Sequence, residues 1–451
     1  MPIASITDKR VHVQPSQVHE VLSRHMLADG YEMVMDLRKS HGSWVFDARK
    51  GRKMLDFFSN FASCPIGYNH PRMDNAEFRE RIADVALNKI ANSDIYTTQM
   101  AEFVETFSRV AIPPPFQKHL FFVEGGALAI ENALKAAFDW KVRKNFAKGY
   151  KEERGTQVMH LREAFHGRTG YTLSLTNTAD PRKTQYFPKF DWPRLPNPKL
   201  RFPATAAVLA DVEKVEKEAV ELAKTFIRER KDDIAAFIME PIQGEGGDNH
   251  FRPEFFRAMR QLCDENEMIM IFDEVQSGVG ITGKMWAFQH VGVEPDMFCF
   301  GKKTQVCGFA SNDRILDIGE NVFTVSSRIN STWGGNLTDM ARSQRYFEII
   351  EDEKLVDNAA KIGAELLGGL EELARRMPGT ITNVRGRGLM CAFDLPDGPT
   401  RDAAINAMEA NDLLVLASGH RSIRFRPHLN LTSEDATEGI RRMETSLRAI
   451  S

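Results

Sequence analysis

The chain has 451 residues, which is too long for one small domain and suits a large core with a smaller second domain. Hydrophobic residues make up 42% and charged residues 27%, a balance typical of a folded soluble protein rather than a disordered chain. The formal net charge of −3 gives no electrostatic basis for nucleic-acid or membrane-surface binding. A small anionic substrate would therefore be held by a few local arginines.

Cysteine usage indicates a reducing compartment, and the absence of long apolar runs argues against a membrane span. The five cysteines are scattered, without a CxxC pair or a nearby histidine cluster, which argues against a disulfide framework and a zinc site. Residues 1–17 carry charges and no apolar segment of a secretory signal. No apolar run approaches the ~20 residues that cross a bilayer. The sequence predicts a cytoplasmic protein without a metal.

Short elements are expected first. The pattern predicts a helix at about residues 17–27 and two strands near residues 43–46 and 54–58. From about residue 101 to 337, short apolar runs then alternate with amphipathic helices. The runs lie at residues 119–123, 158–161, 235–239, 268–272 and 297–300, and the helices at 129–146 and 253–265. This alternation predicts an α/β fold with a mostly parallel central sheet flanked by helices, whose ligands bind beyond the carboxyl ends of the strands.

The pattern after Gly335-Asn336 predicts a smaller α+β domain. One long helical stretch is expected at residues 337–377, and a closing helix at residues 433–449 has Thr432 as its N-cap. Strands are expected at residues 382–395, 413–417 and 422–425.

One glycine-rich segment favours a different enzyme class. Residues 278–284 match the front of a phosphate-binding P-loop and follow an apolar run that ends in Asp273-Glu274, so a nucleotide hydrolase is one interpretation. However, Met285 stands where a P-loop needs Ser or Thr to reach magnesium, and the acidic run precedes the lysine instead of following it. A glycine-rich surface loop is the better interpretation.

Two other features follow apolar runs, and each has an ordinary alternative. Gly125-Gly126 begin a long helix whose free N–H groups can hold a dianion, although an ordinary βα turn looks the same. Asp273 ends a buried run, where a carboxylate needs a cationic partner such as a ring N–H or a structural arginine.

A lysine pair and an aromatic residue complete the set. Lys302 follows the run at residues 297–300, where desolvation makes an amine nucleophilic, but the side chain could equally reach solvent and spacing does not exclude Lys303. Phe165 can stack on a flat ring or belong to the core, and His166 is interpreted as structural. Together the four features meet the needs of pyridoxal 5′-phosphate: a lysine, an acid at the ring nitrogen, a phosphate cradle and a stacking group.

Several longer segments resemble a known family over nearly the whole chain, from about Val18 onward. The class III (omega) aminotransferases of fold type I are similar in FVEGGALAIENALKAA, AFHGRTGYTLSLTN, EPIQGEGGDNHFRPEFF, IFDEVQSG and FGKKTQVCG. Within that class, the L-lysine 6-aminotransferases are most similar in GKKTQVCG, RINSTWGGNLTDM and VRGRGLMCAFDLP. Cys307-Gly308 stands where the broader class usually has two glycines, as in the lysine subgroup.

The resemblance implies cofactor-binding roles. Lys302 carries the cofactor and moves the proton, Asp273 pairs with the ring nitrogen and Gln276 contacts the ring oxygen. The remaining cofactor residues are Phe165 on the ring, and Gly126, Ala127 and Thr332 of the partner subunit on the phosphate. It also implies three segments: residues 1–70 packing with the small domain, a large cofactor-binding domain at 71–337 and the small domain at 338–451.

The resemblance also implies substrate-binding roles. Arg168 clamps the α-carboxylate of lysine, Arg424 grips that of 2-oxoglutarate or glutamate, and Glu245 covers Arg424 while the amine donor is bound. Asn330 is a further substrate-binding residue.

The expected reaction moves the ε-amino group of L-lysine to 2-oxoglutarate. It gives L-glutamate and 2-aminoadipate 6-semialdehyde, which cyclises to piperideine-6-carboxylate, in a homodimer with shared active sites. The alternatives are an omega-aminotransferase for ornithine, 4-aminobutyrate or another diamine, and a mutase or decarboxylase of the same fold.

Overall fold

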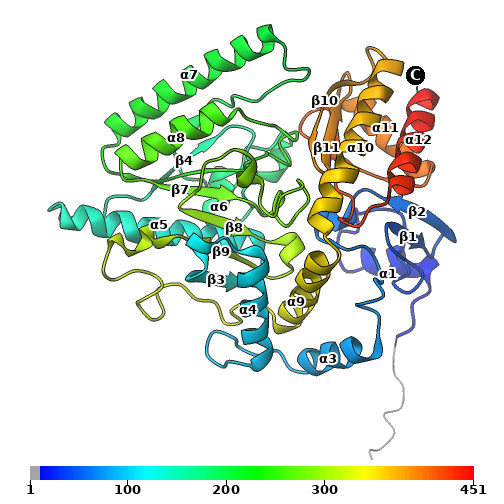
Figure 1. Ribbon diagram of the computed structural model, residues 1–451, viewed down its shortest axis with the longest axis horizontal. Coiled ribbons are helices and arrows are strands. Elements are labelled where there is room, and N and C mark those ends of the chain that lie inside the picture. The colour runs from blue at the N-terminus through cyan, green and yellow to red at the C-terminus, as the bar shows by residue number, and fades with distance from the viewer. Residues whose placement is uncertain (1–10, 451) are drawn as a thin grey trace, which may run out of the picture.

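The computed structural model describes residues 11–450, and a seven-stranded sheet forms its centre (Figure 1). The strand order is β3 (His119–Val123), β9 (Cys307–Ser311), β8 (Met297–Phe300), β7 (Ile269–Asp273), β6 (Ile234–Met239), β4 (Gln157–Leu161) and β5 (Arg194–Leu195). Of the seven strands of this sheet, β9 alone runs in the opposite direction to the others. The predicted α/β fold with a mostly parallel central sheet is confirmed, although β5 and β9 were not expected.

The central strands are apolar throughout because helices cover both faces of the sheet. Every residue of β6, β7 and β8 is buried. Phe237 faces a core cluster that includes residues of α8 (Pro253–Glu265), whereas Ile238 faces a second cluster that includes residues of α5 (Gly126–Ala147). This alternation follows from the two-residue period of a strand and fixes which strand ends are free to form a site.

The carboxyl ends of the strands bring distant residues together. The register pairs Asp273 at the end of β7 with Cys299 in β8, and Lys302 follows three residues later. The turn from β3 into α5 begins at the same edge. In parallel sheets this edge forms the ligand crevice.

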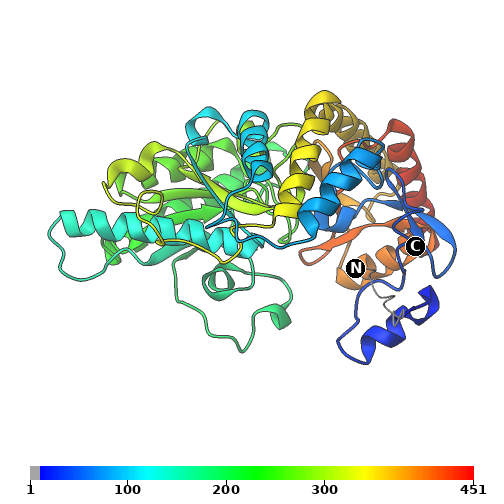
Figure 2. The ribbon, with the colours of Figure 1, turned by 90° about the horizontal axis from the view of Figure 1, so that it is seen from below.

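The two ends of the chain share a second layer of structure, which lies beside the central sheet (Figures 1 and 2). β1 (Trp44–Asp47) pairs with β2 (Arg52–Asp56), and β2 pairs in parallel with β12 (Leu413–Leu414). The remaining strands form a four-stranded sheet in the order β10 (Thr382–Arg387), β11 (Met390–Asp394), β14 (Ser422–Phe425) and β13 (Leu416–Ser418). The expected division at residues 70 and 337 stays a prediction.

The long helical stretch expected at residues 337–377 is divided into two helices. Two helices occupy this stretch, α9 (Leu337–Asp352) and α10 (Leu355–Arg376), and Lys354 between them has a φ of 52°. A left-handed residue cannot continue a right-handed helix. α9 packs against α4 (Thr98–Ala111), whereas α10 packs against the C-terminal helix α12 (Ser433–Ile450).

Six further α-helices are formed by residues 11–450. They are α1 (Val18–Ser23), α2 (Ser59–Ala62), α3 (Ala76–Ala86), α6 (Gly170–Leu175), α7 (Ala206–Glu229) and α11 (Gly398–Ala410). None of the helices formed by residues 11–450 combines the length and apolarity that a membrane crossing needs. Of the N-terminal stretch in which no secretory signal was expected, residues 1–10 lie outside the described residues.

The P-loop-like segment is a packed connection, so the expected surface loop is wrong. Ile281 is buried, and its carbonyl oxygen accepts a hydrogen bond from the Leu389 backbone at 2.8 Å. Lys284 Nζ donates to the Gln289 carbonyl oxygen at 2.9 Å instead of facing an anion site. The glycines of this loop therefore allow close packing between the large sheet layer and α10.

Substituting Gly283 should destabilise the fold through this contact. Its φ is +82°, and a Cβ there would lie 2.9 Å from the Ala360 Cβ. We expect Gly283→Ala to lower the free energy of unfolding by about 2–4 kcal/mol, from backbone strain and overpacking together. The matched control is Gly292→Ala, with a φ of +68° and nothing within 4 Å, which should cost about 1 kcal/mol. Equal shifts of the thermal midpoint for both variants would contradict the packing role.

Candidate active site

A cavity of about 880 Å³ lies at the carboxyl edge of the central sheet. Its lining includes residues of the turns after β3, β4, β6, β7 and β8 and of strand β14. The sequence-predicted residues in this lining are Gly126, Ala127, Phe165, Arg168, Glu245, Asp273, Gln276, Lys302 and Arg424. Nine residues from six separate stretches of the chain thus share one cavity.

The start of α5 provides an anion cradle. Gly125 is the N-cap with a φ of 108°, a conformation that favours glycine, and Gly126 begins the helix. The first N–H groups of a helix have no carbonyl one turn earlier to bind, and they carry the positive end of the helix dipole. The Gly126 and Ala127 backbone therefore presents unpaired donors to the cavity, as a bound phosphate requires.

Asp273 is held in place by a histidine that the sequence interpretation treated as structural. His166 Nδ1 lies 2.8 Å from Asp273 Oδ2, and the Val275 backbone donates to Asp273 Oδ1 at 3.0 Å. Both side chains are buried. The signal for this pair was the position of Phe165-His166 just after β4, but the partner is 107 residues away and could not be identified from spacing.

The structure distinguishes the two neighbouring lysines. Lys302 lines the cavity, whereas the buried Lys303 donates to the Gln276 carbonyl oxygen at 2.7 Å. Burial lowers the pKa of Lys302 to about 8; the positive charges of Arg424 and Arg426 act in the same direction, and Asp273 opposes them. A larger fraction of neutral, nucleophilic amine at neutral pH follows.

Two arginines fix the orientation of Gln276. Its side-chain oxygen accepts from Arg424 Nη1 and from Arg426 Nη2, both at 2.8 Å. A guanidinium only donates, so the oxygen must face the arginines and the NH₂ group remains to donate elsewhere. Arg426, which the sequence interpretation did not single out, is fully buried and forms a two-pronged ion pair with Asp248.

Arg424 differs from Arg426 in lacking a carboxylate partner among residues 11–450. Burial, with help from the charge of Arg426, lowers the pKa of Arg424 to about 10. Its Nε is buried and forms no hydrogen bond with any described residue. An unpaired guanidinium in a cavity is a carboxylate-binding group.

The other residues expected to bind substrate have different surroundings. Glu245 Oε1 accepts from Thr178 Oγ1 at 2.7 Å and from Lys183 Nζ at 2.6 Å, and within the described chain it makes no ion pair with Arg424. Arg168 is exposed at the cavity, with no hydrogen bond or ion pair to another residue between 11 and 450. It is therefore free to bind an anion that enters.

A buried glutamate connects Phe165 with the loop that carries Glu245. Glu240 Oε1 accepts from the Phe165 backbone at 2.9 Å, and Oε2 accepts from the Gly244 backbone at 2.8 Å. Burial, and secondarily the charge of Asp273, raises the pKa of Glu240 well above its usual range. The sequence interpretation did not identify this residue, because a glutamate at the end of β6 looks like an ordinary surface acid.

Asn330 and Thr332 are not brought into this cavity by their own chain. Both are exposed in the segment between β9 and α9, and neither lines the cavity. The Asn330 side-chain oxygen accepts from the neighbouring Ser331 backbone at 2.8 Å. Their expected roles remain predictions, and for Thr332 the prediction requires a second subunit.

The residues in the cavity fit pyridoxal phosphate. The helix start supplies unpaired N–H donors, Asp273 supplies an oriented buried carboxylate, and the Gln276 NH₂ group supplies a donor for a phenolate oxygen. Lys302 supplies an amine whose pKa is lowered, and the half-buried Phe165 supplies an aromatic face. Each need of the cofactor is thus met by a group that lines the cavity.

Comparisons with known proteins agree with this assignment. The family model described as aminotransferase class-III matches residues 26–447. The L-lysine-epsilon aminotransferase of Mycobacterium tuberculosis (strain ATCC 25618 / H37Rv) is 51% identical over 442 residues, covering 97% of this chain and 96% of that protein. The solved structure of lysine aminotransferase from M. tuberculosis in the internal aldimine form covers 97% of this chain and 100% of that chain, with 51% identity and a TM-score of 0.95. The human mitochondrial 4-aminobutyrate aminotransferase is 32% identical, over 89% of this chain and 82% of that protein.

The lowered pKa of Lys302 predicts the pH dependence of cofactor attachment. The neutral amine is the attacking form and predominates above the pKa, so the attachment rate of apoprotein with pyridoxal phosphate should rise with pH and reach half its maximum near pH 8. An ordinary lysine would place this midpoint near about 10.4. The measurement is the absorbance of the attached cofactor between about pH 7 and 10, with Lys302→Ala as the control that shows no attachment. A midpoint near that of an ordinary lysine would contradict the effect of burial.

Proposed function

The chain belongs to the class-III aminotransferase family, and we propose that it transfers the ε-amino group of L-lysine to 2-oxoglutarate. The products are L-glutamate and 2-aminoadipate 6-semialdehyde, which cyclises to piperideine-6-carboxylate. The observation that carries the choice of substrate is the 51% identity, over 97% of the chain, with an L-lysine-epsilon aminotransferase. The 4-aminobutyrate relative, at 32%, is a much more distant match.

Pyridoxal 5′-phosphate, when bound, supplies the electron sink and carries the amino group between the two substrates. In the proposed site, the Gly126 and Ala127 N–H groups hold its phosphate and Phe165 stacks on its ring. Asp273, oriented by His166, accepts the hydrogen bond of the protonated ring nitrogen. Gln276 donates through its NH₂ group to the ring oxygen.

Lys302 has two roles in this proposal. Its Nζ would hold the cofactor, and the free amine would take the proton from the ε-carbon of the bound lysine substrate. A general base works best with a pKa near the working pH, and burial brings the Lys302 amine to about 8. Lys303, whose amine is buried and hydrogen-bonded to Gln276, serves packing.

Two arginines of the cavity bind the substrate carboxylates. Arg168 clamps the α-carboxylate of L-lysine, so that the ε-amine reaches Lys302, and Arg424 binds the α-carboxylate of 2-oxoglutarate or L-glutamate. While lysine is bound, an unpaired Arg424 would repel its cationic end, and Glu245 neutralises Arg424 in that half-reaction. The observed position of Glu245, on Thr178 and Lys183, leaves Arg424 open and suits the 2-oxoglutarate half-reaction.

The proposal includes a cytoplasmic homodimer with shared active sites. The exposed position of Thr332, outside the cavity of its own chain, supports a role for Thr332 of the partner subunit at the phosphate. Asn330, two residues earlier, would reach the substrate of the same neighbouring site. Five free thiols, four of them buried, support a reducing compartment.

Substrate length should decide the rate if Arg168 and Lys302 hold the two ends of lysine. We expect kcat/KM for L-lysine to exceed that for ornithine, which is one methylene shorter, by about tenfold or more, and 4-aminobutyrate to be poorer still. The measurement compares the three amines with 2-oxoglutarate as the common acceptor and requires no turnover when the keto acid is omitted. Equal rates with all three amines would contradict the lysine assignment.

Replacing Arg424 should damage one half-reaction more than the other. Arg424→Lys keeps the charge but loses the two-pronged carboxylate contact, so the 2-oxoglutarate half-reaction should weaken by about ten- to a hundredfold. The lysine half-reaction should change little, because Arg424 does not bind lysine in the proposal. Single-turnover measurements with each substrate separately test this, and equal damage to both half-reactions would contradict the assigned role.

A further inference from the structure

The Glu245 side chain is held on the cavity wall by two side-chain donors. Its Oε1 accepts from Thr178 Oγ1 at 2.7 Å and from Lys183 Nζ at 2.6 Å. The Glu245 side chain is only 16% exposed and that of Lys183 33%, so both groups are partly desolvated and the charged contact is stronger than at the surface. Both side chains line the cavity.

The segment that supplies the two donors is ordered by its own hydrogen bonds. Thr178 Oγ1 accepts from the Asp180 backbone at 3.3 Å, and the Asp180 side chain caps the short turn Pro181–Lys183. Asp180 also forms an ion pair with Arg182, so the Asp180 carboxylate does not compete with Glu245 for Lys183. Within the described chain, Glu245 is the only carboxylate that forms an ion pair with Lys183.

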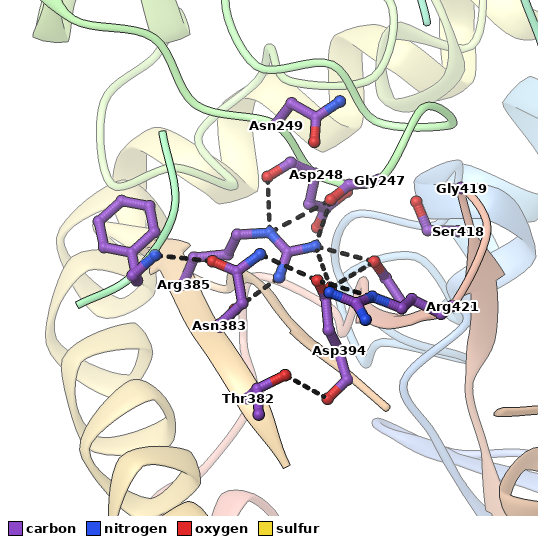
Figure 3. A network of polar contacts seen from close by, with 12 residues as sticks. Gly247, Asp248, Asn249, Thr382, Asn383, Arg385, Asp394, Ser418, Gly419 and Arg421 are labelled. Atoms are coloured by element: carbon purple, nitrogen blue, oxygen red, sulfur yellow. Dashed lines mark hydrogen bonds and ion pairs between the residues drawn. The ribbon is translucent and has the colours of Figure 1, made fainter. Parts of the chain in front are cut away.

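The backbone of Glu245 is held by its own hydrogen bonds, separately from its side chain. Its carbonyl oxygen accepts from the Gly419 backbone at 2.8 Å and from Ser418 Oγ at 3.2 Å. Figure 3 shows the next residues held in the same way, because the Arg385 guanidinium of β10 donates to the carbonyl oxygens of Gly247 and Asp248. Asp394 Oδ1 forms an ion pair with Arg385 Nη2 at 2.9 Å, which holds that guanidinium in place. Only rotation of the Glu245 side chain can therefore change its partner.

One buried hydrogen-bond acceptor and one buried donor in this cavity have no partner among residues 11–450. Glu245 Oε2 and Arg424 Nε are both buried, and neither has a hydrogen-bond partner among the residues described. Leaving such groups unpaired costs free energy, so the docked state of Glu245 is stabilised only in part. The alternative pairing with Arg424 would satisfy both atoms, and the two positions therefore compete.

We propose that Lys183 and Thr178 form a dock that holds Glu245 away from Arg424 and so sets the balance between the two half-reactions. The inference rests on the proposed roles of Glu245 and Arg424. Lys183 is a positioning residue that acts through Glu245: the dock favours the open Arg424 that 2-oxoglutarate needs. Without it, Glu245 spends more time on Arg424 and competes with the keto acid.

The first test is Lys183→Met, which keeps the length of the side chain but removes its charge. We expect the apparent dissociation constant of 2-oxoglutarate in single turnovers to rise about tenfold, while that of L-lysine stays unchanged or falls. Thr178→Val should act in the same direction with a smaller effect. Lys189→Met is the matched control, because Lys189 lies in the same segment and, among residues 11–450, donates only to the Thr184 and Phe187 carbonyl oxygens. It should leave both constants unchanged.

A second experiment, in the Glu245→Ala variant, distinguishes the docking of Glu245 from a direct contact between Lys183 and 2-oxoglutarate. In Glu245→Ala, the dock has nothing to hold, so adding Lys183→Met should have no further effect on 2-oxoglutarate. A tenfold loss that persists in this background would overturn the proposal and assign Lys183 to the substrate itself. A Lys183→Met variant with wild-type constants and an unchanged melting temperature would also overturn it. If the unaltered protein turned over neither L-lysine nor 2-oxoglutarate, the proposed function would fail instead, a result visible before any variant is made.

Discussion

The guanidinium of Arg424 is buried without a carboxylate partner among residues 11–450, and the organisation of the cavity depends on this uncompensated charge. Taking such an ion from water costs several kcal/mol unless a partner offsets it. Arg426, which directly follows β14, avoids the cost by pairing with Asp248. Both arginines donate to Gln276, but only Arg426 has a carboxylate partner among residues 11–450, and in the proposed function a ligand or Glu245 supplies the negative charge at Arg424.

The same positive charge acts on Lys302. Burial lowers the pKa of the Lys302 amine to about 8; Arg424 and Arg426 add to this effect, and Asp273 and Cys307 oppose it. A carboxylate bound at Arg424 would offset part of this effect. The pKa of Lys302 therefore depends on whether a carboxylate is bound at Arg424. This coupling acts through charge alone and needs no movement of the backbone.

Local patterns predicted the features that one stretch of chain determines. Apolar runs placed the central strands, and the residues just beyond them gave Gly126, Asp273 and Lys302, because the carboxyl ends of parallel strands meet at one edge. Pairings across the fold could not be predicted: His166 meets Asp273 over 107 residues. Spacing could not distinguish Lys302 from Lys303, because the direction of each side chain is set by a short turn in which Lys302 has a φ of 54°. The break at Lys354 was missed for the same reason, since apolar periodicity continues through a single left-handed residue.

The proposed exchange of partners by Glu245 would let one cavity accept two different substrates. In either position the Glu245 carboxylate faces a cation, Lys183 in one and Arg424 in the other. While Glu245 stays on Lys183, the buried Arg424 charge has no carboxylate partner among residues 11–450, and a substrate carboxylate bound there offsets the cost of burying it. A ligand shifts such an equilibrium only by its differential affinity for the two states. Because the backbone around Glu245 is fixed, the proposed exchange needs only a side-chain rotation. Such a rotation leaves the packing that positions Asp273 and Lys302 unchanged.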